Sequence, residues 1–154
     1  MHMLGTGQQT SEPGALKAVL PVGWPRPQGY SQAIHVPPGR SMLFVAGQIG
    51  WDVGRKLVST EFLAQFEQAL RNCVSIVEAA GGTAEDIVRL TMYCVDRRAY
   101  AERLSEVGEA YRRVMGRNFP AMSLVEVAAL LEEGALIEIE ATAALRAEGE
   151  RRPG

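Results

Sequence analysis

Two glutamates alternate with isoleucines in the segment ALIEIEATA, which spans residues 135–143. In an extended chain, this period-2 alternation places Glu138 and Glu140 on one side, together with Leu136 and Thr142. A carboxylate in a partly apolar surface is incompletely solvated, which suits it to proton transfer near neutral pH. The alternative interpretation is structural, because carboxylates at an interface or its rim also form ion pairs without doing chemistry.

A methionine is the second side chain of interest. In the segment NFPAMSLVEV, residues 118–127, Met122 follows a Phe-Pro turn at the point where the chain begins to extend. Methionine is a flexible filler of apolar cores, and it also lines sites that bind apolar ligands. The residues alone therefore leave open whether Met122 is a core residue or contacts a substrate.

The composition is that of one globular domain. The 154 residues are 47% hydrophobic and 22% charged, and the formal net charge is -2. This balance offers no basic stripe for phosphates, so we expect no nucleic acid partner. No apolar run of 18 residues is present, and the N-terminal sequence lacks the pattern of a secretory signal, so we expect no membrane association. Cys73 and Cys94 are too few for a disulfide framework; as buried free thiols they favour a cytoplasmic protein.

The elements that position these residues follow from hydrophobic periodicity. Two amphipathic helices are predicted, over residues 59–82 and 97–116. Runs rich in β-forming residues predict five strands, over residues 30–36, 42–50, 86–96, 123–130 and 135–145. The turn LEEG between the last two strands predicts that they pair as a hairpin. The order predicts one α+β domain, residues 29–146, in which both helices cover one face of a mixed sheet. Residues 1–28 are predicted to be irregular, and residues 147–154 to be a disordered tail.

Each predicted helix carries an apolar stripe at the spacing of a buried face. In the first helix the stripe contains Phe62, Phe66, Ala69, Cys73 and Val77. In the second helix it contains Tyr100, Leu104, Val107, Tyr111 and Val114. The arginine pairs at 97–98 and 112–113 are predicted to lie on solvated faces, and Tyr93 and Tyr111 in the core.

Two helices cover only one face of a sheet, so the other face is predicted to be open. We expect this open face to carry Glu138 and Glu140, and Leu124 of the preceding strand to share it. A face with so much apolar area is seldom left to water. Self-association through this face is therefore expected, as a closed and symmetric oligomer with a site where subunits meet.

Five ordered blocks of the sequence resemble the RidA superfamily, which is also called YjgF. The blocks are GYSQAI, FVAGQIG, EQALRNCVSIVEAAGG, FPA-S-VEVAAL and ALIEIEA, and the resemblance runs from Gly29 to about Ala144. The resemblance implies a chorismate-mutase-like α+β fold, assembled as a homotrimer with clefts between the subunits. It also implies a small-molecule substrate and no metal or cofactor. The best-known members hydrolyse reactive enamines and imines to 2-oxo acids and ammonia, and the family has also been labelled translation inhibitor or endoribonuclease.

The resemblance assigns roles to individual residues. Tyr30 matches the tyrosine that lines the cleft, and Gly47 matches the glycine whose backbone faces the ligand. Glu138 matches the glutamate that positions or activates water in the family. Leu124 stands where the family often has cysteine, and its backbone carbonyl is expected to help hold that water.

Three departures from the family pattern concern the substrate. Deaminating members read PARS, and the arginine clamps the substrate carboxylate, a task suited to a planar guanidinium. Met122 occupies that position, and losing the clamp would cost on the order of 2–4 kcal/mol of binding. The family asparagine of the second helix has no counterpart, and Gly108 or Ser105 stands at its position. Trp51 follows the GQI block as a further expected cleft residue.

Three functions remain compatible with these features. The first is hydrolytic deamination of an enamine or imine whose carboxylate is differently placed or absent, such as an aminomuconate-type compound. The second is a trimer that binds a small metabolite without catalysis, because the methionine and tryptophan suit apolar ligands. The third is ribonuclease or translation-inhibitor activity, which the absence of a basic stripe disfavours.

Overall fold

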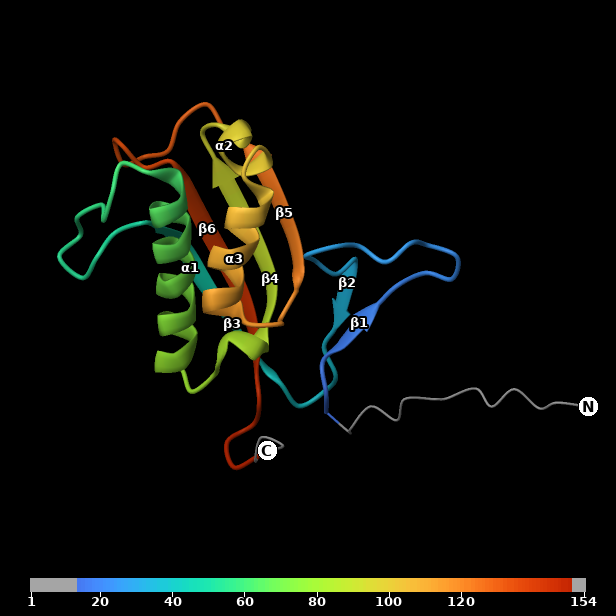
Figure 1. The fold of residues 1–154 in the computed structure, drawn as a ribbon. Helices are drawn as coiled ribbons and strands as arrows, with labels where there is room; N and C mark the ends of the chain where they lie inside the picture. The colour runs from blue at the N-terminus through green and yellow to red at the C-terminus, as the bar shows by residue number, and fades with distance from the viewer. Residues whose placement is uncertain (1–13, 151–154) are drawn as a thin grey trace, which may run out of the picture.

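The structure is a computed structural model that describes residues 14–150 of the chain. Figure 1 shows two layers, in which the helices lie on one face of a four-stranded sheet. The strands follow the order β3 (Ser41–Ile49), β6 (Ile137–Leu145), β4 (Ile87–Cys94) and β5 (Ala121–Glu126). The two long helices are α1 (Phe62–Ala79) and α3 (Leu104–Met115). Strand β6 is antiparallel to both of its neighbours, whereas β5 is parallel to β4. The predicted α+β architecture, one mixed sheet with two helices on one face, is confirmed.

The predicted hairpin of the last two strands is wrong. Strand β6 inserts between β3 and β4, and β5 lies at the edge of the sheet beyond β4. The central place of β6 follows from its sequence, because residues 137, 139, 141 and 143 are all buried beneath the helices. The turn sequence LEEG predicts only that the chain reverses between β5 and β6. It does not determine which strands of the sheet become their neighbours.

The core lies between α1, α3 and the covered face of the sheet. All five residues of the predicted α1 stripe are buried, and so are the alternating apolar residues of β6. On β4, Leu90 and Met92 face the same core. The periodicity of α1 and β6 therefore identified their buried faces correctly.

The burial of both cysteines predicts inert thiols. Burial raises the pKa of the Cys73 thiol to about 12, and it also raises the pKa of Cys94. A pKa near 12 leaves about one thiolate in ten thousand at pH 8, and the thiolate is the reacting species. We expect a chromogenic disulfide reagent to label the folded protein at least about 100-fold more slowly than the protein in denaturant, where both thiols react. Rapid labelling of the folded protein would contradict the buried placement.

The predicted helix over residues 97–116 is divided into two. Helix α2 (Arg97–Ala101) is capped by Asp96, whose carboxylate accepts a hydrogen bond from the Arg98 amide at 2.9 Å. Arg103, with φ -125° and ψ 34°, interrupts the helical backbone before α3 begins. Leu104, the first residue of α3 after this break, is 62% exposed instead of buried, whereas Val107 and Tyr111 of the predicted stripe are buried.

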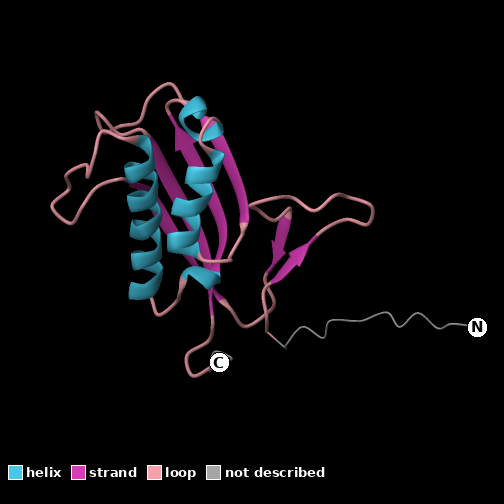
Figure 2. Cartoon of the chain, in the orientation of Figure 1, coloured by secondary structure: helices cyan, strands magenta, loops and turns pink. Residues whose placement is uncertain are grey.

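A separate two-stranded ribbon precedes the main sheet. Strands β1 (Lys17–Val19) and β2 (Ala33–His35) pair antiparallel, and Figure 2 shows the ribbon beyond the β5 edge. Strand β1 corrects the prediction that residues 1–28 are irregular throughout. The remainder of that prediction over residues 1–13, and the predicted tail over residues 151–154, lie outside the described residues. A short 3-10 turn, Ala84–Asp86, leads into β4. None of the helices within residues 14–150 combines the length and apolarity needed to cross a membrane.

Candidate active site

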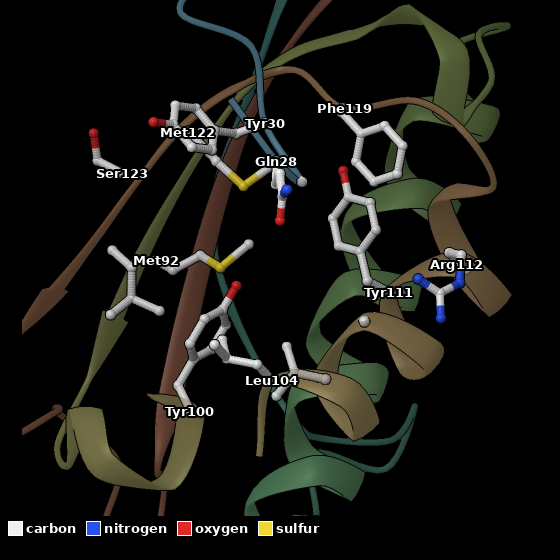
Figure 3. A pocket seen from close by; sticks show the side chains of 14 residues that line it. Gln28, Tyr30, Met92, Tyr100, Leu104, Tyr111, Arg112, Phe119, Met122 and Ser123 are labelled. Carbon is white, nitrogen blue, oxygen red and sulfur yellow. The ribbon is translucent and has the colours of Figure 1, made fainter. Parts of the chain in front are cut away.

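A pocket of about 520 Å³ opens between α3 and the edge strand β5. Figure 3 shows its side chains, with Met122 on one side and Arg112 on the other. Tyr30, Met122 and Leu124, three of the residues predicted from the sequence, line this pocket together. Met92, Tyr100 and Leu104 complete much of the apolar wall. The pocket can therefore hold a small molecule with an apolar body.

Hydrogen bonds fix Tyr30 beside Met122. The backbone amide of Ser31 donates a hydrogen bond to the Pro120 carbonyl at 3.0 Å. The Ser31 hydroxyl donates a second one to the Phe119 carbonyl at 2.6 Å. The backbone bond is part of a short parallel bridge between Ser31 and Ala121. The two segments are 88 residues apart in the chain, yet they present neighbouring side chains to the pocket.

The turn before β5 is held by its own network. The Asn118 side chain donates to the carbonyls of Ala84 and Ile87, at 2.8 and 3.0 Å. Tyr111 donates to the Asn118 carbonyl at 2.6 Å, and its ring stacks on Phe119 with centroids 5.5 Å apart. Tyr111 is buried, as predicted, but its ring also lines the pocket. These contacts attach the start of β5 to α3 and set the width of the pocket.

Glu138 and Gly47 form a second cluster, on the open face of the sheet. The pairing of β3 with β6 shifts between Val45 and Gln48, and this irregularity brings Gly47 beneath the carboxylate of Glu138. A Cβ at position 47 would lie only 2.7 Å from Cδ of Glu138, so any larger residue would displace the carboxylate. Irregular strand pairing is common beside active sites, where it re-aims a side chain.

The two glutamates of β6 differ in their partners. Tyr93 donates a hydrogen bond to Glu140 at 3.0 Å, and this bond is the main reason that the pKa of Tyr93 is raised. Tyr93 therefore lies half-buried on the open face instead of in the core. Glu138 forms no hydrogen bond or ion pair with any side chain in the described range 14–150. Of the two carboxylates, Glu138 is thus the one that is available to a substrate or water.

The two clusters lie on opposite faces of the sheet. In the pairing of β5 with β4, Met122 lies opposite Leu90, and Leu124 lies opposite Met92. Both β4 residues face the helices, so Met122 and Leu124 do too. Glu138 is level with Tyr93, which faces away from them. The prediction that Leu124 shares the face of Glu138 is therefore wrong. Within one chain, Glu138 cannot reach a ligand in the pocket that Met122 lines.

Trp51 lies in neither cluster. It follows β3 in a loop, where its carbonyl accepts a hydrogen bond from Asn72 at 2.9 Å. The Arg55 guanidinium lies over its ring, 5.3 Å from the centroid. These contacts hold Trp51 in the loop after β3, and Trp51 does not line the pocket.

Arg112 and Tyr100 line the pocket but were not recognised as site residues from the sequence. The predicted solvation of the 112–113 pair is confirmed, because both side chains are exposed, and Arg113 forms an ion pair with Glu67 at 2.8 Å. Arg112 also borders the mouth of the pocket, one helical turn after Gly108 on α3. The four-residue spacing of Gly108 and Arg112 places both on one side of a helix, and this spacing could have identified Arg112 from the sequence. The structure contains no cluster of three His, Cys, Asp or Glu side chains suited to a metal among residues 14–150.

Comparisons with known proteins agree with this fold. The family described as Endoribonuclease L-PSP matches residues 25–145. A RutC family protein of Pyrococcus horikoshii is 38% identical over 121 residues, which cover 77% of this chain and 90% of that protein. The human 2-iminobutanoate/2-iminopropanoate deaminase is 36% identical over 115 residues, covering 74% of this chain and 78% of that enzyme.

A solved structure extends the likeness to three dimensions. The crystal structure of YyfB, a Rid family protein of unknown function from Yersinia pestis, gives a TM-score of 0.71 at 34% identity, and the match covers 84% of this chain and 98% of that one. The fold and pocket thus define a small α+β protein of the Rid type. The chain belongs to the endoribonuclease L-PSP family, also called RidA or YjgF.

Proposed function

We propose that the protein hydrolyses a reactive enamine or imine metabolite to a carbonyl compound and ammonia. The observation that carries this proposal is the unpartnered carboxylate of Glu138 above Gly47, in a chain whose pocket suits a small apolar molecule. The name of the human relative, a 2-iminobutanoate/2-iminopropanoate deaminase, supports the reaction class.

The active site is formed between copies of the chain in a homotrimer. The opposite placement of Glu138 and the pocket on one sheet supports a carboxylate supplied by a neighbouring copy. The open face carries exposed apolar side chains, with Phe44 79% and Met42 45% exposed. Contiguous apolar surface of this kind favours burial against another subunit.

The reaction needs only a held water and a carboxylate. Glu138 of the neighbouring copy accepts a proton as the water oxygen bonds to the imine carbon, and the C=N electrons move to nitrogen. Glu138 then returns this proton to the nitrogen, which gives a neutral amino alcohol. The C–N bond breaks as C=O forms, and the hydroxyl proton passes through Glu138 to the departing nitrogen, which leaves as ammonia. An enamine enters the same sequence after a proton moves from its nitrogen to its carbon, which gives the imine.

Ammonia release from imines tests this proposal. Imino acids are generated in situ from amino acids by an amino acid oxidase, and semicarbazide traps the imine that survives. We expect the protein to lower trapping for imines with larger apolar side chains more than for those with two or three carbons, because Met122 offers no charge to hold the smallest substrates. Unchanged trapping for every imine and for 2-aminomuconate would contradict the proposal, and so would a monomer in sedimentation.

A second candidate function is metabolite binding without catalysis. It is favoured by one observation, the two methionines Met92 and Met122 in the pocket wall, because flexible thioethers adapt to varied apolar ligands. Trapping that is unchanged, combined with saturable binding of an apolar carboxylic acid, would support this function instead.

A further inference from the structure

Among residues 14–150, one charged side chain lines the pocket between α3 and β5. That residue is Arg112; the others are apolar, aromatic, glycine or uncharged polar residues. A single cation in an otherwise neutral and largely apolar pocket favours a ligand with one anionic group and an apolar body. The position of this cation therefore determines where the anionic group of a ligand would bind.

Gly108 gives the Arg112 side chain room to lie along the pocket wall. A Cβ at position 108 would lie 3.3 Å from Nη1 of Arg112 and 3.9 Å from its Cζ. A side chain at this position would therefore compete with the guanidinium for the same space. The glycine one turn earlier on α3 allows the arginine to occupy that wall, opposite Met122 (Figure 3).

The Arg112 side chain is exposed, and no other side chain within residues 14–150 competes for its guanidinium. Four other arginines pair with carboxylates: Arg40, Arg71, Arg103 and Arg113. Arg112 forms no ion pair within the part of the chain that the structure describes, residues 14–150. Its donors are therefore available to a ligand carboxylate, which a guanidinium can bind with two parallel hydrogen bonds.

We infer that Arg112 binds the carboxylate of the substrate, and so replaces on α3 the cation that Met122 lacks on β5. The substrate is then an imine or enamine of a carboxylic acid whose branched or aromatic body packs against Met92, Met122 and Leu124. This inference rests on the proposed function for the reaction, but the recognition of a carboxylate is separable from hydrolysis. Arg112 is a specificity-determining residue, and Glu138 remains the candidate base.

Calorimetric titration with a matched pair of ligands tests the inference. The ligands are 4-methyl-2-oxopentanoate, a product of such a substrate, and its uncharged primary amide. We expect the unmodified protein to bind the acid at least about 10-fold more tightly than the amide, as a charged hydrogen bond provides. Arg112→Gln should remove this preference without changing amide binding, and Arg112→Lys should restore part of it.

Arg113→Gln is the matched control, because it removes the adjacent charge on α3 outside the pocket and should keep the preference. Equal binding of acid and amide by the unmodified protein would overturn the inference. So would an undiminished preference in Arg112→Gln, or binding of neither ligand. A preference that depends on Arg112 but is accompanied by no ammonia release leaves the inference standing and overturns the proposed function alone. Ammonia release that Arg112→Gln leaves unchanged overturns the inference alone.

Discussion

Glu138→Gln should reduce kcat/KM for imine hydrolysis by about 10²- to 10⁴-fold, the usual contribution of a general base. Glutamine keeps the size of the side chain above Gly47, but it cannot accept the proton of the attacking water. The fold should be preserved, because Glu138 has no partner within residues 14–150 whose hydrogen bond would be lost. The measurement is the rate of ammonia release at several enzyme concentrations, together with thermal unfolding of both proteins.

Glu140→Gln is the matched control for this substitution. It changes the other carboxylate of β6, which is engaged by Tyr93, and it should leave the rate within a few-fold of the unmodified protein. Equal losses in the two variants would indicate a general effect of charge on the open face, and would contradict a specific role for Glu138.

A mixing experiment tests whether the base comes from another copy. Glu138→Gln keeps an intact pocket, whereas Gly108→Trp fills the pocket and keeps Glu138. If the two clusters meet between subunits, refolding a mixture of the two inactive variants should recover part of the activity. No recovery from mixed oligomers would show that the pocket and Glu138 do not act together across the interface.

Met122→Arg should raise kcat/KM for the smallest 2-imino acids by about 10- to 100-fold. This range corresponds to a charged hydrogen bond worth about 1.5–3 kcal/mol. The new guanidinium would enter the same pocket from β5, where the deaminating members of the family carry their clamp. Met122 is half-buried at the edge strand, so the longer arginine can extend into the pocket without entering the core.

The substitution is best compared with Met122→Leu, which changes shape but adds no charge. The leucine variant should keep the substrate preference of the unmodified protein. The double variant Met122→Arg with Arg112→Gln distinguishes the effects of the two cations. It should show a stronger preference for small imino acids than Met122→Arg alone, because the like charge on α3 is gone. A panel of imines of increasing side-chain size provides the measurement. No gain on small imino acids in either protein would show that position 122 does not contact the substrate carboxylate.

The resemblance to the family predicted the candidate residues, but not their grouping. Tyr30, Met122 and Leu124 meet in one pocket, and Gly47 meets Glu138, as two separate clusters. A set of positions that match a family pattern contains no information on which face of a sheet each occupies. Leu124 illustrates the difficulty: the apolar residues of β5 fall on both sides of the strand, as Leu124 and Val125 do. Its buried side could therefore be assigned only after its pairing with Met92 was known.

The sequence by itself determined the buried faces of α1 and β6, the fold class, and the family. These are properties of local periodicity and of motif order, which need no knowledge of distant contacts. The tertiary structure decided the strand order, because β6 takes the central position where its alternating residues are buried from α1 and α3. It also decided that Arg112 borders the pocket, because the pocket opens between α3 and β5 on the side of α3 that carries Gly108 and Arg112.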